Sequence, residues 1–142
     1  MKTGPYGAIR GEVRTIGNQR VAHGLYRLET AELSRWENFI RDLSALLLVL
    51  PEGAVFTHVT AARLLGWDLP ALPEQVPHFA AVRGADRPRR PGLICSRLTH
   101  ESERRFVHGL PVDTAAEILL RAARDLGDLD LGILVDSASR RR

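Results

Sequence analysis

Several residue types are scarce in this sequence, and each shortage excludes something. Only one of the 142 residues is cysteine, Cys95, so an internal disulfide framework is impossible. The longest apolar run, Leu46-Leu47-Leu48-Val49-Leu50, is far too short to span a bilayer. No apolar stretch follows the first five residues, so we expect no signal peptide, no membrane partner and a cytoplasmic protein.

Lysine is almost absent, because 19 of the 20 basic residues are arginine and Lys2 is the exception. A GC-rich genome accounts for much of this bias, but the placement of the charges is more informative. The net charge is +3 over residues 1–30, −3 over 31–80, +4 over 81–105 and −4 over 106–139. Basic β-type stretches therefore alternate with acidic helical ones.

Patterns that carry enzymatic or metal chemistry are also missing. None of the histidines has an H-x-x-x-H or C-x-x-C partner, so we expect no metal site. The acids of residues 125–136 place glycine, Gly132, where a calcium loop needs a ligand. No phosphate-binding glycine loop and no nucleophile elbow is present. We therefore expect no catalytic residues, no cofactor and no enzyme. The histidines are His23, His58, His78, His100 and His108, and the acids are Asp125, Asp128, Asp130 and Asp136.

The pattern of apolar and turn residues predicts an α+β fold. Residues 8–16 and 20–28 read as a wing-like β-hairpin joined through Gly17-Asn18-Gln19, with a bulge or close packing at Gly24. Further strands are expected at 78–82, 93–98 and 105–108. Amphipathic helices should pack on this small, mostly antiparallel sheet. We divide the chain into residues 1–30, the wing-like hairpin, and 31–142, an α+β domain, together one compact unit.

Capping signals place the helices. Ser34 and Glu37 form a capping box for a helix over 35–50, which Pro51 and Gly53 should end. A helix over 58–65 would begin at Thr57 and end at Gly66, and a third would begin at Asp113 or Thr114 with Glu117 and reach about Leu126. A last helix covers 129–138. Trp36 and Trp67 are read as core anchors, and Cys95 as a small buried residue.

From about residue 43, four motifs follow one another in order. The motifs are Val55-Phe56-Thr57-His58-Val59-Thr60-Ala61-Ala62-Arg63-Leu64-Leu65-Gly66-Trp67, His78 to Gly84, Gly92 to Arg97, and Gly109-Leu110-Pro111-Val112. In these motifs and their order the sequence resembles the AbiEi antitoxin family of type IV abortive-infection toxin–antitoxin systems, and the same module precedes a Vsr-like endonuclease domain in many actinobacterial proteins. With the final helices, the motifs cover about two thirds of the chain. The resemblance implies a winged-helix, DNA-binding transcription regulator and antitoxin in phage defence.

The sequence departs from this family in three ways. The family's arginine and aspartate after G-L-P-V are here Glu117 and Arg121, which four-residue spacing places on one helix face. Only the wing-like hairpin of the winged helix is visible, so we expect its helix-turn-helix to be truncated and no recognition helix to be present. The chain stops at Arg142, before a nuclease domain could begin.

Two partners remain open. The arginines of the predicted hairpins would contact the phosphates of duplex DNA, although a solvated hairpin tip accounts for the same residues. The alternative is a cognate toxin or another protein bound at the acidic helical faces. The sequence gives no oligomeric state. The candidate nucleic-acid-binding residues are Arg83, Arg87, Arg89, Arg90, Arg97, Arg10, Arg14, Arg20 and Arg27.

Overall fold

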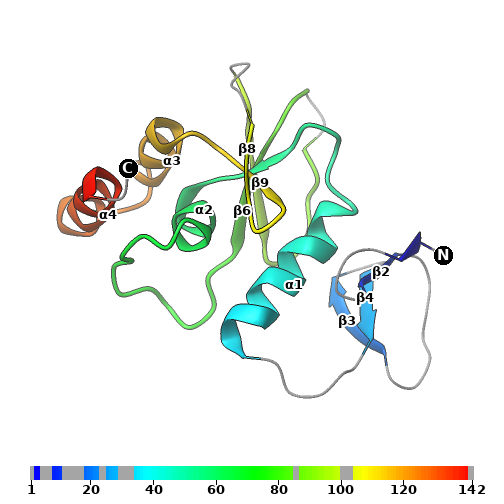
Figure 1. Ribbon diagram of the computed structural model, residues 1–142. Coiled ribbons are helices and arrows are strands. Elements are labelled where there is room, and N and C mark those ends of the chain that lie inside the picture. Colours follow the sequence, from blue (N-terminus) through cyan, green and yellow to red (C-terminus); the bar gives the residue numbers. More distant parts are fainter. Residues whose placement is uncertain are drawn as a thin grey trace. The chain divides into compact units, whose positions relative to one another are not determined.

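The computed structural model shows an α+β chain that falls into two compact units, residues 1–52 and 53–142 (Figure 1). It describes residues 34–84, 87–99 and 104–140, and the backbone of four short strands within the first 28 residues. The helix that follows those strands belongs to the first unit. None of the described helices has the length and apolar character needed to cross a membrane.

The first unit is a four-stranded antiparallel sheet with one helix. Strands β1 (Lys2–Thr3), β2 (Ala8–Arg10), β3 (Asn18–Ala22) and β4 (Leu25–Leu28) lie in the order β1-β2-β4-β3. The predicted pairing of 8–16 with 20–28 is confirmed where β2 meets β4. The two-stranded hairpin is wrong, because β3 occupies part of the predicted turn and pairs with the other edge of β4. Gly24 and residues 11–17, which include Arg14, lie outside the described residues.

Helix α1 (Arg35–Leu47) confirms the first predicted helix and packs against β2 and β4. The backbone N–H of Glu37 donates to Ser34 Oγ at 3.1 Å, so Ser34 caps the helix, and Ser34 Oγ donates to the Glu37 carboxylate at 3.1 Å. Leu43 and Leu46 are buried, but Trp36 is 38% exposed and is not the core anchor expected. It occupies the first turn, where its ring lies 5.7 Å from that of Phe39.

The second unit is built on a five-stranded mixed sheet. Its strands are β5 (Val55–Phe56), β6 (His78–Val82), β7 (Leu93–Arg97), β8 (Arg105–Val107) and β9 (Leu110–Val112), in the order β7-β6-β5-β9-β8. Strand β5 is antiparallel to β6 and parallel to β9, and β8 is antiparallel to β9. Across both sheets, antiparallel pairings predominate among the described strands.

The pairing of β6 with β7 corrects the sequence interpretation. Residues 78–82 and 93–97 are strands as predicted, but they run parallel, with His78 beside Leu93 and Val82 beside Arg97. A parallel pair cannot be a hairpin, and the chain between the strands must return along their length. The ten residues of this connection can span much more than the five-residue strand, so the crossover is physically possible. The arginine-rich segment is therefore a crossover loop and not a hairpin tip.

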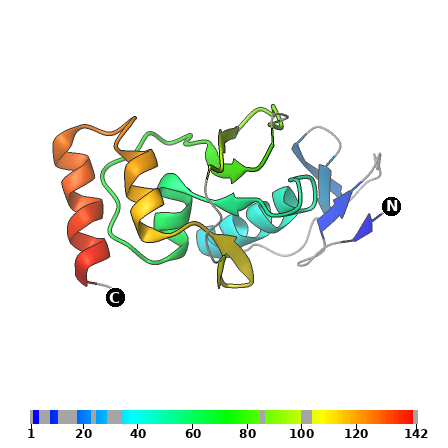
Figure 2. The same ribbon diagram turned by 90° about the horizontal axis from the view of Figure 1, so that it is seen from above.

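Three helices lie on one side of this sheet, with α2 next to it and α4 farthest from it, as both views show (Figures 1 and 2). Helices α2 (His58–Leu64) and α3 (Ala115–Ala122) pack against each other, and α4 (Asp128–Arg140) packs on α3. Thr114 caps α3 by accepting the Glu117 N–H at 3.3 Å, as predicted. Trp67, only 7% exposed, is a core residue as expected. Gly66, with φ +74°, follows the end of α2.

Strand β9 was not among the strands expected from the sequence. His108 and Gly109 have φ values of +52° and +75°, the geometry of a two-residue type I′ hairpin turn. This turn reverses the chain between Val107 and Leu110, so the residues after it pair with β8. Pro111 is buried within β9. The turn and the position of β9 between β5 and β8 therefore allow a strand that contains a proline.

Two glycine substitutions should change stability in opposite directions. Gly109→Ala should lower the free energy of unfolding by about 1 kcal/mol, because alanine resists a positive φ. Gly132→Ala should raise it by up to about 1 kcal/mol, because Gly132 lies exposed inside α4. An added Cβ meets nothing within 4 Å at either position, so the backbone decides both signs. Urea unfolding of the two variants measures this, and changes of the same sign would contradict it.

Candidate functional site

The predicted arginine cluster lies along the crossover loop between β6 and β7. Arg87 and Arg89 are exposed and Arg90 is half-buried, and all three line an open pocket of about 870 Å³. The remaining lining residues are Pro88, Pro91, Leu93, Ile94 and Cys95. The backbone N–H of Leu93 donates to the Arg90 carbonyl at 3.2 Å, which fixes the end of the loop against β7. The pocket therefore combines the loop with the edge strand of the sheet.

The other predicted arginines do not line this pocket. Arg83 and Arg97 are exposed and lie at the carboxyl ends of the parallel strands, away from the bridge at Arg90. Arg83 follows β6, and Arg97 is the last residue of β7. Arg10, Arg20 and Arg27 lie on β2, β3 and β4 of the first unit. Only Arg87, Arg89 and Arg90 of the nine candidates thus share one described site.

Charge compensation around the loop is sparse. In the described part of the chain, no Asp or Glu lies within ion-pair distance of Arg87, Arg89 or Arg97. The acids elsewhere in the second unit are mostly engaged. Asp68 and Asp136 lie 2.8 and 3.0 Å from Arg140, and Glu117 lies 3.6 Å from Arg121. The guanidinium groups of Arg87 and Arg89 therefore have no carboxylate partner among the described residues.

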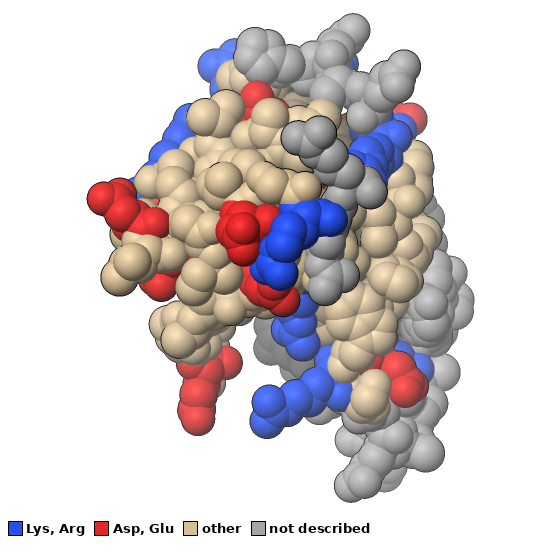
Figure 3. Space-filling view, turned by 60° about the vertical axis from the view of Figure 1, so that its left-hand side comes forward, with Lys and Arg blue, Asp and Glu red and all other residues tan. Residues whose placement is uncertain are grey.

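On the side of the second unit formed by its helices, acidic side chains are less dominant than the composition suggests. Figure 3 turns this side forward and shows red and blue side chains next to each other, with wide uncharged areas between them. As predicted, Asp128 and Asp130 lie in the first turn of α4. Leu129, which is 89% exposed, and Ile133, which is 40% exposed, lie four residues apart on the same helix. The surface of α4 is thus partly apolar.

Cys95 lies on β7 beside the arginine loop. It is half-buried, so the expectation of a buried side chain is wrong. An edge strand has a neighbour on one side only, which leaves part of the side chain open. Burial raises the pKa of the thiol, and the charge of Arg87 opposes that rise. A raised pKa reduces the thiolate fraction, and the thiolate is the reactive form.

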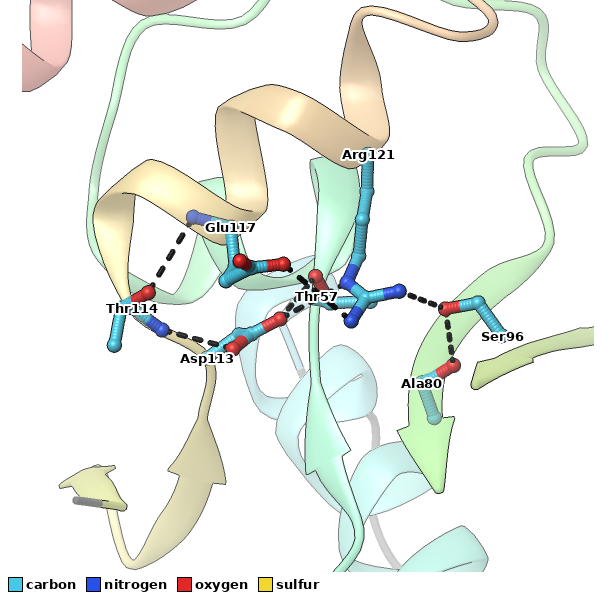
Figure 4. A network of polar contacts seen from close by, with 7 residues as sticks. All are labelled: Thr57, Ala80, Ser96, Asp113, Thr114, Glu117 and Arg121. Atoms are coloured by element: carbon cyan, nitrogen blue, oxygen red, sulfur yellow. Dashed lines mark hydrogen bonds and ion pairs between the residues drawn. The ribbon is translucent and has the colours of Figure 1, made fainter. Parts of the chain in front are cut away.

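A buried polar network centres on Arg121 (Figure 4). Its Nε donates to Asp113 Oδ2 at 3.1 Å and its Nη1 donates to Ser96 Oγ at 2.9 Å. Arg121 is 6% exposed and Asp113 is 1% exposed. Thr57 Oγ1 also donates to Asp113 Oδ2, at 3.0 Å. The side chain of Arg121 descends from α3 between Asp113 on one side and Ser96 on the other, so one guanidinium joins two distant parts of the sheet.

The sequence predicted only part of this network. The pairing of Glu117 with Arg121 is confirmed at 3.6 Å. Thr57 stands at the N-cap of α2, but its side chain does not cap the helix and binds Asp113 instead. Asp113 was read only as a possible cap. The usable signal was that Thr57 and Asp113 each follow a buried strand, because the carboxyl ends of parallel β5 and β9 lie side by side.

His58 is the second buried polar centre. It is 4% exposed, and its ring stacks on Phe79 with centroids 4.0 Å apart. Nδ1 accepts the Val59 N–H at 2.8 Å, so in the neutral ring the proton lies on Nε2, which is 2.9 Å from Asp125 Oδ2. Burial lowers the pKa of His58, and Asp125 opposes this through its hydrogen bond and its charge. The helix predicted over 58–65 placed His58 in its first turn, which is confirmed, but the burial of His58 and its partner were missed.

The backbone of His58 is also unusual, with φ +57° at the start of α2. A left-handed conformation costs about 1–2 kcal/mol for residues other than glycine. The stacked Phe79 and the bond to Asp125 hold the residue in place despite this cost. His58 thus ties the start of α2 to the turn that follows α3.

Among the residues the structure describes, no group of three or more His, Cys, Asp or Glu could hold a metal ion. Comparison with models of protein families, with curated proteins and with solved structures yields no match for this chain.

Stability should fall in mild acid because of His58. Its pKa is lowered in the folded protein, so the unfolded chain binds the proton more readily. The free energy of unfolding should therefore decrease as the pH falls below the ordinary histidine pKa of about 6.5. Above that pH, the contribution of neutral His58 to stability should be fully present. His58→Asn, which tolerates a positive φ, should be less sensitive to pH than the wild type.

The measurement is urea unfolding at about pH 5.5 and about pH 7.5, on either side of the ordinary histidine pKa. His108→Asn is the matched control, since His108 also has a positive φ but lies exposed in a turn. This control should keep the wild-type pH dependence. Equal pH dependence in the wild type and His58→Asn would contradict the role given to His58.

Proposed function

We propose that this chain is a non-catalytic, cytoplasmic, antitoxin-like regulator that binds the phosphate backbone of duplex DNA through Arg87, Arg89 and Arg90. The observation that carries the proposal is the convergence of these three arginines on one open pocket. Guanidinium groups that keep their charge and present a planar fork suit phosphate oxygens. The absence of a carboxylate within ion-pair distance of Arg87 and Arg89, among the described residues, supports the same reading.

The resemblance to the AbiEi antitoxin family supports the regulatory part of the proposal. The chain's motifs occur in the family's order, and the arginine loop lies between two of them. Binding through a loop and an edge strand would position the protein on the phosphates, which carry no direct sequence information. We therefore propose a salt-sensitive contact of low sequence preference.

Binding a cognate toxin or another protein is the second candidate function. Its support is the apolar surface of α4, where Leu129 and Ile133 are exposed on neighbouring turns. Exposed apolar side chains that cluster are typical of protein contacts. Copurification with the product of a neighbouring gene, lost in Leu129→Ser with Ile133→Ser, would favour this function over DNA binding.

The DNA proposal predicts a salt-dependent affinity carried by the loop. Titration of duplex DNA at about 50 and about 200 mM salt should show a clear loss of affinity at the higher concentration. Replacing Arg87, Arg89 and Arg90 with alanine should weaken binding at low salt about tenfold or more. The slope of log affinity against log salt concentration should also become shallower, by the equivalent of up to about three phosphate contacts.

The matched control replaces Arg35, Arg105 and Arg124 with alanine, which removes the same charge from exposed positions elsewhere. It should retain nearly wild-type affinity. Equal losses in the two triple variants would mean that only net charge matters, and the loop assignment would be wrong. No DNA binding by the wild type at low salt would reject the proposed function.

A further inference from the structure

Strand β7 offers a regular edge of backbone hydrogen-bonding groups. It lies at the end of the sheet order, with β6 on its inner side. The His78 N–H donates to the Gly92 carbonyl and the Leu98 N–H donates to the Val82 carbonyl, both at 2.8 Å. Even-numbered residues of this segment therefore direct their backbone groups towards β6, and odd-numbered residues direct theirs outward.

Part of this outer edge is already used. The Leu93 N–H donates outward to the Arg90 carbonyl at 3.2 Å, and the loop diverges after that bond. Cys95 and Arg97 follow with outward N–H and C=O groups that have no backbone partner within the described residues. Unpaired groups at this spacing are what an added strand requires.

The two faces of the edge differ in chemistry. Ile94 is 50% exposed and is apolar. Cys95 points to the opposite face, because side chains alternate along a strand. Arg87 lies close enough to Cys95 for its charge to affect the thiol. Arg89 and Arg90 line a pocket that includes both Ile94 and Cys95. A partner strand would meet an apolar side chain on the face of Ile94 and the guanidinium group of Arg87 on the face of Cys95, with two more guanidinium groups beside the edge.

We propose that the outer edge of β7 binds an extended peptide whose apolar and acidic side chains alternate, as an added strand of the sheet. The backbone of the peptide pairs with Cys95 and Arg97, its apolar residues lie beside Ile94, and its carboxylates meet Arg87, Arg89 and Arg90. Main-chain pairing provides affinity in this mode of recognition, and alternate side chains provide specificity.

A peptide fits this edge better than a nucleic acid does. Phosphates accept hydrogen bonds from N–H groups but cannot donate to the outward carbonyls of Cys95 and Arg97, whereas a peptide backbone does both. The opposite edge of the sheet is less suited, because β8 has only three residues. This inference goes beyond the proposed DNA binding and does not depend on it, since the test contains no DNA.

The test uses a fluorescent peptide of about seven alternating valine and glutamate residues, long enough to pair with the five-residue β7. Fluorescence anisotropy should show saturable binding, and amide hydrogen exchange at Cys95 and Arg97 should slow in the complex. Arg87→Gln with Arg89→Gln should weaken binding about tenfold or more. Arg35→Gln with Arg124→Gln, which removes equal charge elsewhere, should change it little.

Two control peptides separate strand addition from simple charge attraction. One has the same composition with its valines and glutamates in separate blocks, and the other is N-methylated along its backbone. Both should bind at least about tenfold more weakly, because the first loses the alternation and the second loses its backbone donors. Equal binding of all three peptides would overturn the proposal. Dimerisation of the free protein with Cys95 and Arg97 amides already protected would assign the edge to a second copy and would also overturn it.

Discussion

The ion pair between Arg121 and Asp113 is the interaction on which the second unit depends. Asp113 is fully enclosed, accepts from the Thr57 hydroxyl and the Thr114 N–H as well as from Arg121, and stands where β9 becomes α3. A buried carboxylate without its counter-ion would be strongly unfavourable. Since replacement by apolar residues is often tolerated, such a pair contributes less to net stability than to fixing one arrangement. Here it fixes the junction between the sheet and α3.

The same guanidinium connects this junction to the candidate binding surface. Arg121 donates to Ser96 on β7, and Ser96 Oγ lies 3.4 Å from the Ala80 carbonyl on β6. The strand that carries the outward groups of Cys95 and Arg97 is therefore anchored from its inner side. An anchored edge strand holds the outward groups of Cys95 and Arg97 in place, which favours strand pairing because less order remains to be imposed on binding. DNA and an acidic peptide would require the same arginines, so the loop cannot serve both at once.

Local signals in the sequence were sufficient for most helices and strands. The pairs Ser34 with Glu37 and Thr114 with Glu117 marked two helix starts, since capping involves residues three apart. Non-local features were not accessible in this way. The parallel pairing of β6 with β7 depends on which strand lies between β7 and β5, and short apolar segments do not specify this. The burial of His58 likewise depends on Phe79 and Asp125, which are distant in sequence.

The candidate site was likewise predictable in its local features and not in its non-local ones. The sequence identified the arginines of the crossover loop because their density is a local property. It could not show that Arg83 and Arg97 lie apart from Arg87, Arg89 and Arg90, because that separation follows from the direction of β7. The edge itself was also invisible, since whether a strand has one neighbour or two is a property of the whole sheet.

The most direct test of this account compares Arg121→Met with Arg140→Met by urea unfolding. Arg140 forms ion pairs with Asp68 and Asp136 but is 61% exposed, so its loss should cost no more than about 1 kcal/mol. Loss of Arg121 leaves the Asp113 carboxylate buried and uncompensated and should cost about 3–5 kcal/mol, part of which Asp113→Asn should restore in the double variant. If Arg121→Met is no more destabilising than Arg140→Met, the buried pair does not organise the second unit, and the account is wrong.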